Sequence, residues 1–362
     1  MVCEFNGSAR CNSKGSYTKN DLMRLIKEVN SSDSVMIGQQ SNINGDSAAI
    51  AKTLCDFKQA TGKELPIVGF DVRFSNLAKL GESGCNQVLG DLIDYASKGG
   101  IITASAHFSN PLKGDPAKES YRGSLGNDDV WQELVTKGSA LNESFTSELS
   151  GIADFFEELE KCGVPIIWRP LHEANGCWFW FCMVQKLEGG LYKVSEKCYR
   201  DLWIYIYNYM TVERGLKNLI WSYSPNIGAE SDSMVSPLYG YPGDEYVDIV
   251  GLDWYTNGNY ERINETPTYS ELASTGKIVN IAEFGPTGDA LAKEAKDQPD
   301  LFSCKDMLKY LENLKNDGKH IAYILNWTDV WSIKAMGYGD VLMNSSLTLS
   351  LDDVNKLFKN MR

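Results

Sequence analysis

Eight short apolar segments recur along the chain, separated by longer polar or amphipathic stretches. The segments are rich in β-branched and aromatic residues, a composition typical of buried strands. Each is only about as long as one strand, so the pattern predicts eight separate strands. They cover residues 35–40, 66–74, 101–108, 164–173, 219–225, 247–255, 277–285 and 321–327.

Helical spacing fills the stretches between these segments. Residues 145–161 repeat apolar side chains at intervals of three and four, and Gly163 and Pro165 end the pattern. Residues 46–61 begin at Asp46, a candidate N-cap, and stop before Gly62. Alternating strands and helices predict a parallel sheet, and eight such units predict an α/β fold closed into a (β/α)8 TIM barrel.

An open, doubly wound sheet is the alternative to a closed barrel. It would favour a glycine-rich phosphate turn after the first strand, and Gly38-Gln39-Gln40 lacks the required spacing. We therefore expect a single domain. Its predicted parts are an N-terminal extension packed on the barrel (1–30), the catalytic barrel (31–362) with a closing helix (351–361), and insertions on the substrate side (186–201 and 256–274).

Charged side chains gather where two of the predicted strands end. Arg169, His172 and Glu173 fall within five positions at the end of the fourth segment, and Glu283 closes the seventh. In a (β/α)8 barrel the carboxyl ends of the strands carry the active site. Two carboxylates at one barrel mouth suit glycoside hydrolysis. The aromatic run at 178–181 supplies flat rings of the kind that stack on sugars.

Two motifs carry a specific resemblance. Trp-Arg-Pro-Leu-His-Glu, ending at Glu173, and Ile-Ala-Glu-Phe-Gly, around Glu283, resemble glycoside hydrolase family 26, which is dominated by endo-β-1,4-mannanases on (β/α)8 barrels. The resemblance extends from Gly38 to about Trp331. It implies a retaining double displacement with Glu173 as acid/base, Glu283 as nucleophile and carboxyl groups roughly 5–5.5 Å apart.

The same resemblance implies further substrate-binding residues at the barrel mouth. Tyr255 should hold the nucleophile, Trp178 should lie beyond the bond that is cleaved, and Trp327 should form a platform under the sugar that is attacked. Ala174 stands where the family often has methionine. The complete predicted set is His107, Arg169, His172, Trp178, Asp253, Tyr255 and Trp327.

Elementary chemistry agrees with these roles. Arg169 and Glu173 have the same strand parity, so both should point into the barrel. A tyrosine hydroxyl donated to Glu283 would favour its ionised form, and burial beside apolar rings would raise the pKa of Glu173.

Simpler structural roles stay open for several of these residues. Arg169 suits a buried ion pair as well as a substrate contact, and His107 and His172 could be core histidines. Phe179 and Phe181 are predicted to pack, Trp254 to lie outside the barrel wall, and His320 to be incidental, whereas Trp131 and Trp331 are undecided.

Composition narrows the possible partners. The net charge of −13 disfavours nucleic acid and anionic membranes, and no apolar run is long enough to span a bilayer. The 9 tryptophans and 18 tyrosines suit a neutral polysaccharide or oligosaccharide. We expect a monomer that needs no metal and no organic cofactor, since two carboxylates complete the reaction.

The cysteine pattern bears on localisation. Nine cysteines without paired CxxC units argue against zinc and permit disulfide bonds, with candidates at Cys3–Cys11 and one pair among Cys177, Cys182 and Cys198. The N-terminus has no signal-peptide pattern, which fits a mature or a cytosolic form. We expect a secreted protein whose signal peptide is absent from this chain. Sequons that permit secretion begin at Asn6, Asn30, Asn142, Asn264, Asn326 and Asn344.

These observations favour an endo-β-1,4-mannanase acting on mannan, glucomannan or galactomannan. A β-1,3-1,4-glucanase or β-1,3-xylanase is the alternative within the resemblance, because the catalytic motifs do not separate them. A non-catalytic carbohydrate-binding barrel is the alternative from another class. It is disfavoured because both glutamates and their neighbours Arg169, His172 and Tyr255 are present.

Overall fold

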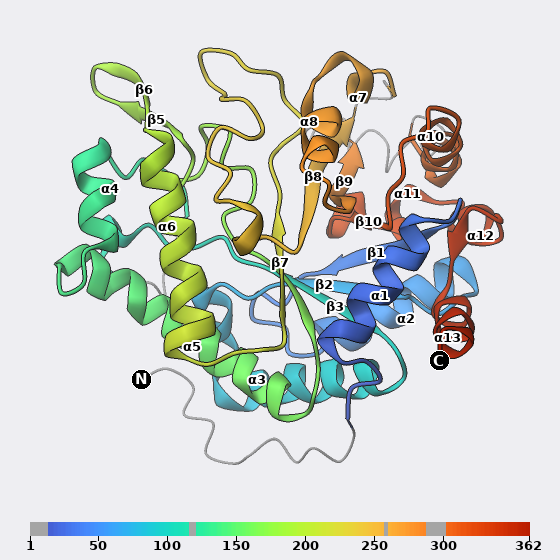
Figure 1. Cartoon of the computed structure of the whole chain (residues 1–362). Coiled ribbons are helices and arrows are strands. Elements are labelled where there is room, and N and C mark those ends of the chain that lie inside the picture. The colour runs from blue at the N-terminus through green and yellow to red at the C-terminus, as the bar shows by residue number, and fades with distance from the viewer. Residues whose placement is uncertain (1–13, 116–120, 257–259, 287–301) are drawn as a thin grey trace.

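A closed barrel of parallel strands forms the centre of the computed structural model, which describes residues 14–115, 121–256, 260–286 and 302–362 (Figure 1). The pairing order is β1-β2-β3-β4-β7-β8-β9-β10, and β10 returns to pair with β1. Each predicted apolar segment overlaps one of these strands, and three strands extend one residue further, so the predicted (β/α)8 barrel is confirmed. The strands are β1 (Val35–Ser41), β2 (Ile67–Asp71), β3 (Ile101–Ser105), β4 (Ile166–Arg169), β7 (Leu219–Tyr223), β8 (Ile249–Thr256), β9 (Val279–Pro286) and β10 (Tyr323–Asn326).

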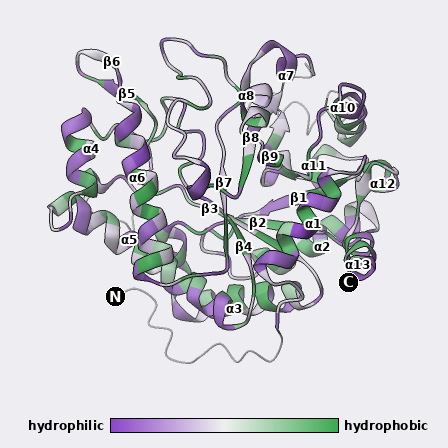
Figure 2. Ribbon diagram, in the orientation of Figure 1, coloured by the Kyte–Doolittle hydropathy of each residue, from purple (hydrophilic) through white to green (hydrophobic). Residues whose placement is uncertain are grey.

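Helices surround the barrel and present their apolar faces to it. Figure 2 shows hydrophilic and hydrophobic residues along the same helices, the amphipathic pattern expected for this position. The α-helices are α1 (Lys19–Asn30), α2 (Ala49–Thr61), α3 (Phe74–Ser97), α4 (Asp128–Val135), α5 (Ala140–Lys161), α6 (Glu196–Asn208), α7 (Arg262–Glu265), α8 (Thr268–Ser274), α10 (Cys304–Asn316), α11 (Ile333–Met336), α12 (Gly339–Met343) and α13 (Leu351–Asn360). Shorter turns are η1 (Pro111–Lys113), η2 (Tyr209–Glu213), η3 (Asp244–Tyr246) and η4 (Asp329–Trp331).

The start of α2 differs from its prediction. The helix begins at Ala49 with Ala48 as N-cap, whereas Asp46 accepts a hydrogen bond from the Ala48 backbone N–H at 3.0 Å in the preceding turn. An aspartate that bonds its own backbone two residues on makes a turn rather than a helix cap. The predicted end is correct, because Gly62 terminates α2 in the left-handed conformation.

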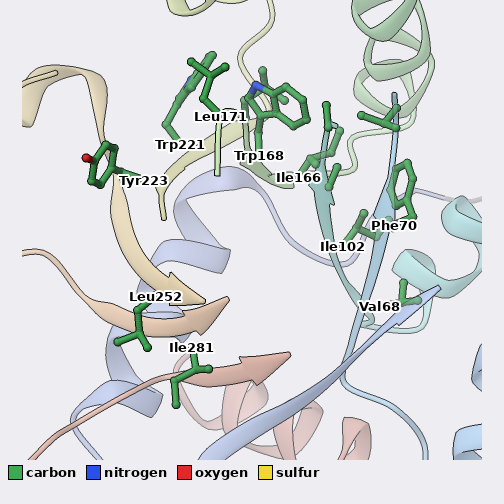
Figure 3. Close-up of a cluster of buried hydrophobic side chains, with 14 of the residues drawn as sticks. Val68, Phe70, Ile102, Ile166, Trp168, Leu171, Trp221, Tyr223, Leu252 and Ile281 are labelled. Atoms are coloured by element: carbon green, nitrogen blue, oxygen red, sulfur yellow. The ribbon is translucent and has the colours of Figure 1, made fainter. Parts of the chain in front are cut away.

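Two apolar layers hold the barrel together. The outer layer lies between strands and helices, and Figure 3 shows Val68, Phe70, Ile102 and Trp168 as part of it. The inner layer fills the lower barrel with inward side chains of the strands and joins α1 to them. Its members include Leu22, Leu25, Ile26 and Val29 from α1 together with Met36, Ile67, Ile101, Ile167, Ile220, Ile249 and Tyr323 from the strands. The helix before β1 therefore closes one end of the barrel and leaves the other end for the site.

The predicted insertion at 186–201 divides into two structures. An antiparallel hairpin of β5 (Val184–Leu187) and β6 (Gly190–Lys193) rises above the barrel, and residues 196–201 already belong to α6 (Figure 1). A short strand, β11 (Thr348–Leu349), pairs in parallel with the first two residues of β1, Val35 and Met36. Within the described residues, no helix combines the length and apolar character needed to cross a membrane.

Candidate active site

Glu173 enters the site through a sharp turn after β4. The strand ends at Arg169, and both Leu171 and Glu173 adopt left-handed backbone conformations, with φ of 51° and 55°. Non-glycine residues rarely adopt this region, and such strain concentrates at functional sites. The backbone N–H of Glu173 donates to the carbonyl of Ser224 at 2.8 Å, which ties the turn to the end of β7. The predicted strand parity therefore does not explain how Glu173 is placed, because the strand has ended at Arg169 and the turn carries Glu173 to the barrel mouth.

Two donors hold the carboxylate of Glu173. Trp178 Nε1 donates to Oε2 and Asn226 Nδ2 donates to Oε1, each at 2.7 Å. Burial raises the pKa of Glu173 to about 7, and the negative charge of Glu283 adds to the rise, whereas the two hydrogen bonds oppose it. A carboxyl group with this pKa can hold a proton near neutral pH and return to its ionised form, as a general acid/base requires.

Glu283 sits on β9 in a different environment. Tyr255 donates its hydroxyl to Oε2 at 2.8 Å, and Arg169 Nη2 donates to Oε1. A guanidinium and a phenol hydroxyl both stabilise a carboxylate in its charged form. One carboxylate oxygen from each of Glu173, Asp253 and Glu283 lies within 4.8 Å of the others. Two glutamates from β9 and the turn after β4 therefore share one small volume.

Arg169 lies beneath the carboxylates with only 2% of its surface exposed. Nη1 donates to Asp253 Oδ2 at 2.9 Å, and Ser224 donates to the other Asp253 oxygen at 2.7 Å. Burial raises the pKa of Asp253, and the positive charge of Arg169 opposes that rise. Both ends of the guanidinium are occupied by protein, so Arg169 forms a buried ion pair rather than an open substrate contact. The three carboxylates could bind a cation only if this guanidinium moved away.

The two histidines of the predicted set lie against each other. Their Nε2 atoms are 3.2 Å apart and the rings meet edge to face, and His172 Nε2 is also 3.9 Å from Glu283 Oε1. Burial lowers the pKa of His172 well below its usual range, and the nearby charge of Arg169 lowers it further. His107 bonds Asp71, the last residue of β2, through Nδ1 at 2.6 Å.

The aromatic residues divide into site and packing groups. Trp178 and Trp327 are half-buried. Trp178 bonds Glu173, and the Trp327 ring lies 6.0 Å from the His107 ring. Phe179 and Phe181 are buried and pack near the His172 ring. Trp254 is fully buried and stacks on Tyr310 of α10, outside the strands, as predicted.

The sequence left the roles of Trp131 and Trp331 undecided, and the structure places these two side chains in different environments. Trp131 is a core residue of α4. Trp331 covers Gly285 so closely that a Cβ atom added there would lie 2.4 Å from the ring, and its indole N–H donates to the carbonyl of Pro286 at 2.9 Å. Only glycine at position 285 permits this approach beside Glu283.

Sequence reasoning missed three polar residues of the site. Asn226 follows β7 and Asp71 ends β2, and both positions at strand ends could have drawn attention. Asn175 is less accessible to prediction, because its partner is distant in sequence. It donates to the carbonyl of Asn226 at 2.9 Å and accepts from the backbone N–H of Asn226 at 2.8 Å.

A cavity of about 650 Å³ opens beside Trp327. Its lining comes from the end of β1, one side of α2 and residues 328–335, and it includes none of the clustered carboxylates. Gln39 borders it and donates to the carbonyl of Trp327 at 2.8 Å while accepting from the Ile333 N–H at 2.9 Å. This side chain fixes the loop that carries the predicted sugar platform.

The predicted disulfide among the site cysteines is wrong. Cys177, Cys182 and Cys198 are all free thiols, and Cys182 is buried beneath the aromatic run. Cys182 donates weakly to the Glu173 carbonyl at 3.5 Å and is used for packing instead of crosslinking. Cys3 and Cys11 lie outside the described residues.

Comparisons with known proteins agree on one family. Residues 11–336 match the family described as glycosyl hydrolase family 26. A mannan endo-1,4-beta-mannosidase of Bacillus subtilis is 31% identical over 302 residues, which is 82% of this chain and 75% of that protein. The mannan endo-1,4-beta-mannosidase A and B of Caldalkalibacillus mannanilyticus is 30% identical over 339 residues, 92% of this chain and 60% of that protein. The solved structure of the Bacillus subtilis mannanase BCman superposes with a TM-score of 0.75 at 28% identity, covering 94% of each chain.

Proposed function

The chain belongs to glycosyl hydrolase family 26 and is a glycoside hydrolase, and from this premise we propose that it is a retaining endo-β-1,4-mannanase. The substrate class follows from the relatives, which are named as mannan endo-1,4-beta-mannosidases. Mannan, glucomannan and galactomannan are the candidate polymers.

One observation carries the proposed mechanism: the carboxylate oxygens of Glu173 and Glu283 approach within 4.8 Å. Retaining enzymes place their carboxyl groups about 5–5.5 Å apart, whereas inverting enzymes leave about 6.5–9.5 Å for a water molecule. The short separation supports direct attack by a carboxylate on the sugar. It leaves too little room for water between the two groups.

The environments assign one role to each glutamate. Glu173, with its pKa raised to about 7, donates a proton to the leaving oxygen and later accepts one from water. Glu283, supported by Arg169 and Tyr255, attacks the anomeric carbon. Asp253 is a poorer nucleophile because it is fully buried and both of its oxygens are engaged.

Azide rescue of two alanine variants tests these roles. On a mannoside with an activated leaving group, Glu173→Ala still forms the glycosyl-enzyme, and azide should release the β-mannosyl azide. Glu283→Ala has no nucleophile, so azide must attack the free face and give the α-mannosyl azide. Azide products of the opposite configuration would exchange the two assignments, and rescue of neither variant would contradict both.

A product profile tests the substrate. Mannohexaose, cellohexaose and mixed-linkage glucan are compared under the same conditions. The proposal predicts mannobiose and mannotriose from the first and no cleavage of the others. Cleavage of the glucan alone would instead support the glucanase alternative.

Because an intact polysaccharide is too large to enter a cell, we also propose that the protein acts outside it as a monomer. Two independent measurements test this proposal: detection of the natural protein in culture fluid, and its mass in solution. Retention in the cell or a dimer would contradict it.

A further inference from the structure

Asp71, the last residue of β2, contacts His107. Its Oδ2 is 2.6 Å from His107 Nδ1, and its Oδ1 accepts from the backbone N–H groups of His107 and Arg73 at 3.2 and 3.1 Å. Within the part of the chain that the structure describes, neither Asp71 oxygen is hydrogen-bonded to Glu173 or Glu283. Any influence on the reaction must therefore pass through His107.

The carboxylate fixes which nitrogen of His107 carries hydrogen. Burial alone would raise the pKa of Asp71, but that pKa is lowered, and the hydrogen bond from His107 together with the positive charge and backbone N–H of Arg73 contribute to the lowering. An ionised carboxylate only accepts hydrogen bonds, so His107 Nδ1 must be the donor. In the neutral ring this leaves His107 Nε2 as an acceptor.

The two histidines contact each other through their Nε2 atoms. Because His107 Nε2 accepts, the hydrogen bond across 3.2 Å requires an N–H on His172 Nε2. His172 Nδ1 is then the bare nitrogen, and it is a buried atom without a hydrogen-bond partner among the described residues. The opposite tautomer would bury an N–H donor there without an acceptor, which proteins avoid more strictly than an unpaired acceptor.

We propose that Asp71 is a positioning residue that sets the tautomers of both histidines, so that a neutral His172 keeps its Nε2–H directed between His107 and Glu283. The inference rests on Glu283 being the nucleophile. With the tautomers reversed, His172 would present a lone pair to the Glu283 carboxylate, 3.9 Å away, instead of a donor. Repulsion would then replace attraction beside the Glu283 carboxylate.

Asp71→Asn is the decisive variant. The amide oxygen keeps the two backbone N–H donors on the Oδ1 side, which places the amide N–H group against His107 Nδ1. That nitrogen must then accept, and the hydrogen moves to His107 Nε2. His172 Nε2 becomes the acceptor in turn. Asp94→Asn is the matched control, because Asp94 is exposed and its carboxylate pairs with Lys98 at 2.7 Å.

The tautomers can be read directly because the chain has 3 histidines. Long-range ¹H–¹⁵N correlation spectra at the pH of maximal activity should show Nδ1–H on His107 and Nε2–H on His172, with His107→Asn and His320→Asn spectra for assignment. Asp71→Asn should reverse both rings, and Asp94→Asn should change neither. A wild-type His172 protonated on Nδ1 would overturn the proposal, as would unchanged tautomers in Asp71→Asn.

Kinetics on mannohexaose supply the second measurement. Asp71→Asn should lower kcat by about 10²-fold, the scale on which loss of one preorganised donor acts. KM should change little, because Asp71 itself does not reach the sugar, whereas a merely misfolded site would alter both. An unchanged kcat would overturn the inference. Absence of mannan cleavage by the wild type would contradict only the proposed function, since the tautomers are measured without substrate.

Discussion

At the residue scale, the site depends on two chemically identical side chains kept in different environments. Glu173 is surrounded by neutral donors, Trp178 and Asn226, whereas Glu283 contacts the Arg169 cation. Desolvation without a cation raises a carboxyl pKa, and a paired cation stabilises the ionised form. The same residue type therefore suits an acid in one place and a nucleophile in the other.

The pH profile should report Glu173 directly. An acid must be protonated before glycosyl transfer, so kcat/KM in the wild type should fall as pH rises through about 7, the raised pKa of Glu173. Glu173→Gln should remove this basic limb along with most activity on natural substrates. A limb that persists unchanged in the residual activity of Glu173→Gln would exclude Glu173 as the acid.

Asn226→Ala should move that limb without removing it. The Asn226 amide donates to Glu173 at 2.7 Å and lowers its pKa by favouring the charged form. Without this donor the pKa of Glu173 rises further, so the basic limb should shift to higher pH. A shift to lower pH would mean that the amide has the opposite effect. The kcat/KM profiles of the two proteins provide the comparison.

At the element scale, the barrel strands could be predicted from the sequence, but the turns that orient the side chains of the site could not. Each barrel strand coincides largely with an apolar run, and such runs can be recognised in the sequence, whereas the polar hairpin strands β5 and β6 were not predicted. The turn from Arg169 to Glu173 leaves no such trace, because its two left-handed residues include Leu171, which favours other conformations. Motif resemblance identified Glu173, but partners such as Asn226 arise from contacts between segments distant in sequence.

The helix α5 offers an element-scale test through Glu148. Its carboxyl group is buried and accepts from the Ser109 N–H at 2.9 Å and the Phe74 N–H at 3.4 Å, joining the segments after β3 and β2. Burial raises the pKa of Glu148 to about 8 and the backbone donors oppose the rise. Its stabilising contribution is complete below the unfolded pKa, near 4.5, and is lost as pH rises through about 8.

Chemical denaturation across this pH range tests whether the stabilising contribution of Glu148 decreases as pH rises. The unfolding free energy of Glu148→Gln should fall less steeply between pH 4.5 and 8 than that of the wild type, because the amide does not ionise. Glu143→Gln, on the exposed side of the same helix, should follow the wild type. Parallel curves for Glu148→Gln and wild type would show that Glu148 does not titrate as described.

At the scale of the whole molecule, one end of the barrel serves stability and the other serves chemistry. The α1 helix packs its apolar face against the inner layer of the strands at the closed end. The carboxylates gather at the opposite ends of the strands, as in other (β/α)8 barrels. Periodicity and motifs could predict this division. The fully buried Arg169 network could not be deduced from them, because burial depends on the complete fold.

A substitution in α1 should lower the stability of the protein without changing its catalytic activity. Leu25 is fully buried, and Leu25→Ala should lower the unfolding free energy by about 2–5 kcal/mol by leaving a cavity. The kcat of folded protein should stay unchanged, because α1 lies at the far end from the site. Lys27→Ala, on the exposed face of α1, is the control for denaturation. Equal stability of the two variants would contradict the packing described for α1.

The most direct test of the central claim is the configuration of the first product. ¹H NMR during cleavage of mannohexaose reports the anomeric proton of the new reducing end before mutarotation. Two carboxylates within 4.8 Å predict the β-anomer first, because two successive displacements retain configuration. Initial appearance of the α-anomer would show a single displacement by water and contradict the roles given to Glu173 and Glu283.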